Sequence, residues 1–487
     1  MPLLPSPSKF FIALAILFSG ICWYLGFGLT GNFWYLIWVA PIPVLYVCFQ
    51  VSGKQAFAIA FIAYLIGRLS WLPYLLSVAP APLAIMFTIL LPLAFAVLVI
   101  GARRVLLVSP HWLAAFAFPV LFTAFEYVMF LLSKDGTMAS IAYTQCRFLP
   151  VVQVASVTGI EGITFLITFI PSVIAVMVMR YKAKKSVTAL TWLTAGIFCI
   201  ALLFGSVRLA DDPADKQVTV PVGMAVINEK IYDSTFSTGT LKQLYIAGLY
   251  LNEVSVLATQ GAQVIVLPEK VFRVSDSTSP VILKLFEDTA IARHVSIVIG
   301  VTKIKQGYLE NNAWVISDEG KLLADYEKVH LFEGEIYDTF RTGKDLGLFS
   351  RNGSDEGVAI CKDFDFQQYI LGFGKAKRAL VYAPAWDFVR DGWLHSRMAM
   401  MRSVEGGYSL VRNAREGRLT INDYRGKLLF EASCESRTQT ELLGKVPLEN
   451  HATIYSSLGD WFGILNLIAT AWFIFSMTAK KKAVPSN

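Results

Sequence analysis

Cysteine and histidine are scarce in this sequence, and their scarcity excludes whole classes of site. The 487 residues include 6 cysteines and 5 histidines. None of their spacings resembles a zinc site or a disulfide framework. We therefore expect no metal and no cofactor, and we expect a cysteine in a polar domain to be either buried or chemically active.

Charged residues are also few, at 16% of the chain, although the net charge is +7. The basic residues form no stripe interleaved with aromatic residues, which excludes a nucleic-acid partner. The sequence has no internal repeat and no low-complexity tract. It is instead rich in apolar residues, with 55% hydrophobic residues and a mean hydropathy of +0.53, which indicates a membrane protein.

Long apolar runs are confined to the two ends of the chain. A spanning helix needs roughly 20 mostly apolar residues. We predict a membrane domain of about seven helices over 1–207, a polar domain over 208–455, and a last transmembrane helix with a basic tail over 456–487. The eight expected spans are residues 10–28, 33–50, 55–74, 83–101, 112–132, 155–179, 188–206 and 459–477.

Basic residues near the ends of these spans predict their orientation. Lysine and arginine favour the cytoplasmic side of a membrane. Most of those near span ends fall on one side, so we expect both termini in the cytoplasm and the polar domain on the outer face. They are Lys9, Lys54, Arg103, Arg104, Arg180, Lys182, Lys184, Lys185, Lys480, Lys481 and Lys482.

The polar domain alternates between apolar strands and amphipathic helices, which predicts an α/β layered fold with both sheet faces covered. Residues 208–216 and 445–458 are expected to be linkers to the membrane parts. The expected strands are 217–227, 264–267, 295–301, 313–317, 357–361, 379–383 and 408–412, and the expected helices are 238–260, 280–294, 365–374 and 393–406.

Three reactive side chains lie where an apolar run ends: Glu269 follows the expected strand 264–267, Lys328 follows the short run Leu322–Tyr326, and Cys361 ends the expected strand 357–361. Such positions suit catalysis because the sheet fixes a side chain while the loop exposes it. Taken singly, each residue is more often structural: a buried small thiol, a solvated carboxylate or a surface amine. Their shared placement favours a chemical role.

An acid, an amine and a thiol are the groups needed for acyl transfer through a thioester. A free thiol has a pKa near ~8.5 and is mostly protonated at neutral pH. Glu269 would therefore act as general base for Cys361. Lys328 would stabilise the oxyanion formed when the thiolate attacks a carbonyl. The thioester would then be cleaved by an amine or by water.

The sequences around Glu269, Lys328 and Cys361 resemble those of the carbon–nitrogen hydrolase (nitrilase) superfamily. Over nearly the whole chain, the sequence resembles the membrane branch of that superfamily, the apolipoprotein N-acyltransferase family. The order of the three residues and the succession of about seven spans, one domain and one span are similar to that family. The matching stretches are Lys328-Val-His330-Leu331-Phe-Glu-Gly334-Glu335 (one residue shorter than the family motif), Ala359-Ile-Cys361, Met400-Met-Arg402-Ser-Val-Glu405 with Arg412, Phe125-Glu126-Tyr127, Thr158-Gly-Ile-Glu161-Gly-Ile-Thr-Phe165 and Gly459-Asp-Trp461.

The resemblance implies an αββα sandwich for the polar domain, on the periplasmic face of a bacterial inner membrane. It implies that Glu269 is the base, that Lys328 stabilises the oxyanion and that Cys361 carries the acyl group, with Glu335 as a fourth polar member that orients Lys328 or the thiol. The donor would be a phospholipid giving its sn-1 acyl chain. The acceptor would be the α-amino group of a diacylglyceryl-cysteine lipoprotein, and the protein would be a monomer.

The sequence departs from the family pattern directly after the nucleophile. An aromatic residue and a glutamate are usual there, whereas Cys361 is followed by Lys362 and Asp363. We expect Asp363 to replace the glutamate as a shorter carboxylate and Lys362 to add a cation near the thiol. Residues 384–388 and 414–417 also differ, and the family's Glu-x-x-Arg-Gly motif of the membrane part lacks its arginine here.

Two further sets of residues are weaker candidates. Trp386, Phe388 and Trp393 are candidates to line an acyl groove, or they belong to the core or to a membrane-facing surface. Glu126 and Glu161 lie in expected spans, where charge is costly. They bind lipid head groups or the lipoprotein, or they are hydrogen-bonded to neighbouring helices at the interface.

Two other functions stay open at the level of the sequence. A membrane-tethered amidase or nitrilase-like hydrolase of small molecules would use the same residues with water as acceptor. A non-catalytic homologue that binds lipoproteins would explain the altered residues around Lys362 and Arg415-Glu416.

Overall fold

The described residues of the computed structural model form two compact units. The model describes residues 7–108, 112–210, 218–228, 239–435 and 439–482. The first unit comprises Met1–Lys134, Ala139–Ala210 and Asp460–Asn487, and the second comprises Asp135–Met138 and Asp211–Gly459. The domain boundaries expected from the sequence, after residues 207 and 455, remain a prediction.

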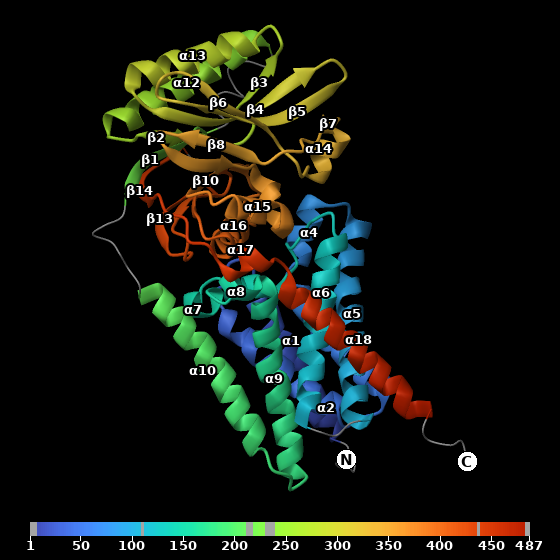
Figure 1. Ribbon diagram of the computed structural model, residues 1–487. Helices are drawn as coiled ribbons and strands as arrows, with labels where there is room; N and C mark the ends of the chain where they lie inside the picture. Colours follow the sequence, from blue (N-terminus) through green and yellow to red (C-terminus); the bar gives the residue numbers. More distant parts are fainter. Residues whose placement is uncertain (1–6, 109–111, 211–217, 229–238, 436–438, 483–487) are drawn as a thin grey trace. The chain divides into compact units, whose positions relative to one another are not determined.

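The first unit is helical and apolar (Figure 1). Within the described residues, five helices are long and apolar enough to cross a membrane. A sixth is added if the pair α3 (Gly53–Arg68) and α4 (Leu72–Val78), bent by 61°, counts as one span. The five are α1 (Lys9–Gly26), α5 (Ala81–Val108), Trp112–Leu132 with α6 (Ala117–Leu132), α9 (Ile160–Lys182) and α10 (Thr188–Ala210).

Five of the eight expected spans, or six with the bent pair, are long and apolar enough among the described residues, and the expected span 459–477 is part of the helix α18 (Trp461–Lys482). The expected span 33–50 is divided into a 3₁₀ turn (Trp34–Trp38) and α2 (Pro41–Cys48). The expected span 155–179 is interrupted at Gly159, whose φ of 70° ends α8 (Ala155–Thr158) before α9 begins. Hydropathy predicts the length of an apolar segment, but it does not predict where the helix within that segment is interrupted.

Three further apolar helical stretches lie among the described residues of this unit. They are Trp34–Cys48, Leu149–Thr158 and Trp461–Ser476. The second of these contains α7 (Leu149–Val152) and α8, and the third is the first part of α18 (Trp461–Lys482).

The second unit contains two β-sheets. The larger has eight strands in the order β14-β1-β2-β4-β5-β6, with β3 paired to β4 and β7 to β5, and the smaller has the order β13-β12-β11-β10-β9-β8. Their bounds are β1 Thr219–Val226, β2 Val264–Val266, β3 Phe272–Ser275, β4 Ser296–Lys305, β5 Tyr308–Ile316, β6 Leu322–Glu327, β7 Phe340–Arg341, β8 Gly347–Arg351, β9 Ser354–Val358, β10 Leu380–Trp386, β11 Ser409–Arg415, β12 Arg418–Asn422, β13 Leu428–Ser433 and β14 Thr440–Pro447.

Successive side chains of a strand point to opposite faces of its sheet. Apolar residues on both faces of these strands therefore let each sheet pack against helices on one side and against the other sheet on the other side. Ile297 and Ile299 of β4 pack with α12 (Thr240–Thr259) and α13 (Ser279–Arg293), which cover the larger sheet (Figure 1). Val298, between them, packs against the smaller sheet.

On the other side, Val381 packs with α15 (Gln367–Lys375) and α16 (Gly392–Gly406). The order is helices, sheet, sheet, helices, so the expected αββα sandwich is confirmed.

The C-terminal end of this unit differs from the sequence expectation. Residues 445–458 were expected to be a linker, but β14 runs to Pro447 and pairs antiparallel with β1 over its whole length. Helix α17 (Ile454–Leu458) follows. The half-exposed, partly polar strand β14 has a weak apolar signal, and its pairing with β1 makes it a strand. Most of the expected linker 208–216 lies outside the described residues.

Candidate active site

Lys328 is the centre of a buried ion cluster directly after β6. Its Nζ lies 2.8 Å from Glu269 Oε1 and 2.9 Å from Glu335 Oε2. All three side chains are 3% exposed or less. The structure therefore brings together two of the three reactive residues predicted from the sequence and the expected fourth member.

The loop that carries Glu269 is shaped by close backbone contacts. Gly300 on β4 donates from its backbone to Pro268 O at 3.1 Å. A Cβ at Gly300 would lie 2.5 Å from the Cα of Glu269, so only glycine permits this approach. Lys270, the next residue after Glu269, has a φ of 55°. This fold of the loop leaves the Glu269 and Lys270 side chains both directed into the ion cluster.

Two members of the cluster were missed by sequence reasoning. Asn311 on β5 donates from Nδ2 to Glu269 Oε1 at 2.7 Å and to Glu335 Oε1 at 2.6 Å. Lys270 forms an ion pair with Glu335. Asn311 could have been found from the sequence, because a polar asparagine shortly before an apolar run is unusual within a strand. Nothing in the sequence indicates that the Lys270 side chain points towards Glu335.

Cys361 was expected at the end of a strand, but it lies on a strained turn after that strand. Strand β9 ends at Val358, and Cys361 opens a 3₁₀ turn (Cys361–Asp365) with a φ of 44°. Such a left-handed conformation in a residue with a Cβ costs about 1–3 kcal/mol and is typical of functional sites. The half-buried thiol is 3.5 Å from Trp386 O, to which it donates.

Asp363 holds this turn in place. Its fully buried carboxylate accepts from Ile360 N at 2.9 Å, from the Tyr326 hydroxyl at 2.6 Å and from His330 N at 2.8 Å. Tyr326 and His330 flank Lys328 in the chain. Asp363 thus ties the turn of the nucleophile to the segment of the amine.

Charge and burial fix the protonation states of these groups. Burial and the Glu269 carboxylate raise the pKa of the Cys361 thiol well above its usual range, and Lys328 opposes this shift. Burial lowers the pKa of Lys328, but the carboxylates of Glu269 and Glu335 outweigh it, so this pKa lies well above its ordinary value. The resting site therefore holds a neutral thiol and a charged ammonium.

Lys362 does not add a cation to the thiol, contrary to the sequence expectation. Its Nζ lies 2.6 Å from Asp135 Oδ1. Asp135 belongs to the tetrapeptide Asp135–Met138, which is part of the second unit, and Thr137 donates from N and Oγ1 to Asp365 O at 2.9 Å. The tetrapeptide thus supplies the carboxylate that pairs with the Lys362 ammonium, and it braces the turn.

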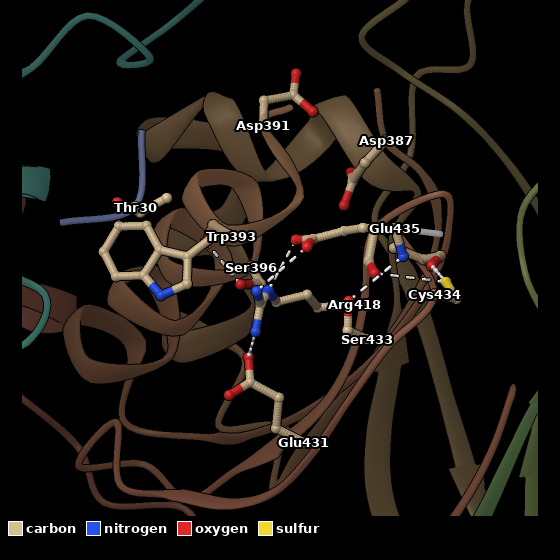
Figure 2. A network of polar contacts seen from close by, with 12 residues as sticks. Thr30, Asp387, Asp391, Trp393, Ser396, Arg418, Glu431, Ser433, Cys434 and Glu435 are labelled. Atoms are coloured by element: carbon tan, nitrogen blue, oxygen red, sulfur yellow. Dashed lines mark hydrogen bonds and ion pairs between the residues drawn. The ribbon is translucent and has the colours of Figure 1, made fainter. Parts of the chain in front are cut away.

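The candidate groove residues are in different environments. Trp386 and Phe388 are exposed, and Phe388 packs on Phe332 at 5.3 Å between ring centroids. Trp393 is only 4% exposed and lies on α16 near the polar network of Figure 2. In that network Arg418 joins Glu431 at 3.1 Å and Glu435 at 2.9 Å. An acyl groove lined by these aromatic residues remains a prediction.

Another buried ion pair joins Asp387, directly after β10, to Arg412 in the middle of β11. Arg412 donates to both oxygens of Asp387, at 2.9 and 2.5 Å. Gly417 permits this arrangement, because a Cβ there would lie 2.1 Å from Asp387 Oδ2. Asp387 directly follows Trp386, whose carbonyl accepts from the thiol of Cys361, so the pair fixes the backbone behind the nucleophile.

The two membrane glutamates are buried in the first unit. Glu126 on α6 accepts from Ser140 Oγ at 3.1 Å, from Ile141 N at 2.9 Å and from Thr164 Oγ1 of α9 at 2.7 Å. Glu161 lies in the first turn of α9 and is 1% exposed. For Glu126 the structure shows the hydrogen-bonded alternative, and binding of head groups or lipoprotein remains a prediction for both.

Comparison with known proteins gives the family. A model of the apolipoprotein N-acyltransferase N-terminal domain matches residues 19–173, and the carbon–nitrogen hydrolase model matches residues 205–438. The apolipoprotein N-acyltransferase of Geobacter metallireducens is 24% identical over 507 residues, covering 92% of each chain. That of Haemophilus ducreyi is 26% identical over 416 residues, covering 78% of each chain. An amidase from Nesterenkonia sp. is a structural neighbour at 17% identity, covering 51% of this chain and 96% of that chain with a TM-score of 0.43.

The two family matches follow one another along the chain and together extend over most of it. The ion cluster and the strained cysteine lie inside the second match, and the apolar helices of the first unit lie mainly inside the first. The chain is a bacterial membrane protein that belongs to the apolipoprotein N-acyltransferase family, in the carbon–nitrogen hydrolase superfamily.

Proposed function

We propose that this protein transfers a fatty acyl chain from a phospholipid, through a thioester on Cys361, to the N-terminal amine of a diacylglyceryl-cysteine lipoprotein. The observation that carries the proposal is the buried pair of Glu269 and Lys328 beside a neutral thiol on a strained turn. The relatives' shared name, apolipoprotein N-acyltransferase, supports the choice of lipoprotein acceptor.

In the first step Glu269 removes the thiol proton of Cys361. Its Oε1 already accepts from Lys328 and Asn311, and no partner of Oε2 is found among the described residues, so Oε2 is the free basic atom. The thiolate forms a C–S bond with the ester carbonyl carbon, and the ester C–O bond then breaks. The proton held by Glu269 passes to the departing lysophospholipid oxygen.

The oxyanion formed in this step needs fixed donors. Lys328 supplies one, as a charged ammonium held by two carboxylates. The backbone N–H of Lys362 supplies a second, because the first N–H groups of a helical turn have no partner within the turn. We infer that Lys362 contributes this N–H and not its side chain, which is paired with Asp135.

In the second step the amine of the lipoprotein attacks the thioester. A C–N bond forms and the C–S bond breaks, while Glu269 takes a proton from the amine and returns one to the sulfur. Both substrates carry acyl chains, and exposing those chains to water would cost about 25 cal/mol per Å² of apolar surface. A membrane-bound enzyme avoids this cost because its substrates stay in the bilayer.

We further propose that the protein is monomeric and lies in the inner membrane, with both termini in the cytoplasm and the second unit on the periplasmic face. The distribution of lysine and arginine near the apolar helices supports this orientation. Cysteine labelling of single positions on either side, in intact and permeabilised cells, tests it. One such position is Gly307, in the exposed turn between β4 and β5. Labelling of a cysteine introduced there only after permeabilisation of the inner membrane would overturn the orientation.

Reconstitution of the full chain tests the function. Protein in phospholipid vesicles is given a diacylglyceryl peptide with a free α-amino group, and products are followed by mass spectrometry. We expect the peptide to gain one acyl chain, and a matched peptide with an acetylated amine to gain none. Release of free fatty acid alone would indicate a hydrolase, and absence of any acyl adduct on Cys361 would indicate a non-catalytic homologue.

Lys270 is expected to stabilise the ion cluster in a pH-dependent way. Burial raises the pKa of Glu335, but Lys328 and Lys270 outweigh it and lower this pKa below its ordinary value. A lowered pKa stabilises the fold above the unfolded pKa of about 4.3, and this contribution is lost as the pH falls through the folded pKa. Lys270→Met should therefore raise the pKa of Glu335 and cost about 1.4 kcal/mol per pKa unit at neutral pH.

Thermal unfolding in detergent across acidic and neutral pH measures this effect. The difference between wild type and Lys270→Met should be largest near neutral pH and shrink as the medium becomes more acidic. Lys270→Arg should restore most of it, and Lys305→Met, which removes an ion pair with the exposed Asp276, should change little. A difference that stays constant with pH would mean that Lys270 acts through packing alone.

A further inference from the structure

Arg68 is a buried cation at a break between helices of the first unit. It is the last residue of α3, after which the chain bends by 61° into α4. The residue is 4% exposed. Its guanidinium carbon lies 4.6 Å from the ring centroid of Trp71 and 5.6 Å from that of Phe27.

The guanidinium of Arg68 has no hydrogen-bond or ion-pair partner among the residues that the structure describes, and its Nε is a buried donor without an acceptor. Three half-buried arginines of the same unit behave differently. Arg103 donates to the carbonyls of Cys48 and Val51, Arg180 to that of Ser186, and Arg208 to Gln153 Oε1. The most deeply buried of these four arginines is therefore the one without an acceptor.

Glu126 acts on Arg68 electrostatically, but from beyond ion-pair distance. Its carboxylate accepts from the neutral donors Ser140, Ile141 and Thr164, and no ion pair joins it to Arg68. A buried charge without a hydrogen-bond acceptor costs several kcal/mol. A charged group within the membrane part of a protein marks a candidate functional site.

The position of Arg68 along α3 indicates the source of an anion for this site. Helix α3 has 16 residues and begins beside Lys54, so its two ends are about 22 Å apart. The hydrocarbon core of a bilayer is about 30 Å thick, which brings the two ends of such a helix towards opposite head-group regions. Trp71 donates from its indole to Phe27 O at 2.8 Å, and tryptophan is enriched at membrane interfaces.

We propose that Arg68 binds the phosphodiester group of a membrane phospholipid at the bend between α3 and α4. The two aromatic rings lie against the guanidinium, and its N–H edge remains to donate. A guanidinium fork binds two phosphate oxygens with parallel hydrogen bonds, which a lysine ammonium does not reproduce. This site is separate from the chemistry proposed for Cys361 and does not depend on it.

Native mass spectrometry of the full chain tests the proposal. Wild type and Arg68→Gln are titrated in detergent with a phosphatidylethanolamine and with a diacylglycerol that has the same chains but no phosphate. We expect wild type to retain one more phosphatidylethanolamine than the variant, with at least tenfold weaker binding in the variant. Binding of diacylglycerol should be equal in both. Equal retention of phosphatidylethanolamine by the two proteins would overturn the proposal.

Matched variants and competitors complete the test. Arg103→Gln removes an arginine that already has carbonyl acceptors, so it should retain the lipid bound at Arg68. Displacement of the lipid by millimolar inorganic phosphate would overturn the assignment to a phospholipid. If Arg68→Gln does not fold, the comparison of the two lipids on the wild-type protein tests the site. Selective retention of phosphatidylethanolamine over diacylglycerol supports the site, and equal retention of the two lipids overturns it. Cys361→Ser should bind the lipid normally, which keeps this result separate from the proposed acyl transfer.

Discussion

Replacement of Cys361 with serine is expected to abolish acyl transfer, with a loss of about 10⁴-fold or more. The hydroxyl of serine is a much weaker acid than a thiol, and burial and the Glu269 carboxylate already raise the pKa of the group at this position. Glu269 would be unable to generate the alkoxide. We expect mass spectrometry to detect an acyl adduct on Cys361 in wild type and none in the variant.

Cys434→Ser provides the matched control. Cys434 is the other described cysteine of the second unit, and its buried thiol donates to Ala414 O at 2.8 Å. The control should keep its acyl adduct and its activity within a few-fold of wild type. Activity of Cys361→Ser close to that of the control would remove Cys361 from the role of nucleophile.

Replacement of Glu269 with glutamine is expected to lower the rate of thioester formation by about 10³–10⁴-fold. Glutamine keeps the shape of the side chain and still accepts hydrogen bonds from Lys328 and Asn311. It has no basic oxygen to accept the thiol proton. The measurement is the rate of appearance of the acyl adduct after mixing with phospholipid.

The control for this variant is Glu335→Gln, in the same ion cluster. Glu335 also contacts Lys328, but it is assigned only an orienting role, so its loss should cost about 10–100-fold. Because groups that act as a unit are not additive, Glu269→Gln combined with Cys361→Ser should be no slower than Cys361→Ser alone. Equal effects of the two glutamate variants would mean that Glu269 orients Lys328 and is not the base.

The sequence predicted the outline of the second unit well. Periodic apolar residues located the main helices and seven of the fourteen described strands. The catalytic roles of Glu269, Lys328 and Cys361 stay predictions. The predictions of fold succeeded because burial imposes a local pattern that a single sequence displays. The edge strand β14 escaped detection, because its half-exposed residues carry little of that pattern.

Sequence reasoning was less successful where side-chain direction matters. Lys362 was expected beside the thiol, but it pairs with Asp135, more than 200 residues earlier in the chain. Asn311 and Lys270 were missed because their roles depend on the position of Glu335. The bend after Arg68 and the break at Gly159 were likewise invisible to hydropathy.

By itself, the sequence determined that this protein has apolar membrane helices, an αββα domain and an acid, an amine and a thiol suited to acyl transfer. Composition and periodicity are local properties, and they suffice for the apolar helices and for a layered α/β domain, whereas the αββα order of the layers was implied by the resemblance to the family. Only the tertiary structure decided which charges meet: Lys328 between two carboxylates, Lys362 turned to Asp135, and Arg68 buried without an acceptor among the described residues. Coulomb energy depends on distance in space, and the order of residues along a chain does not give that distance.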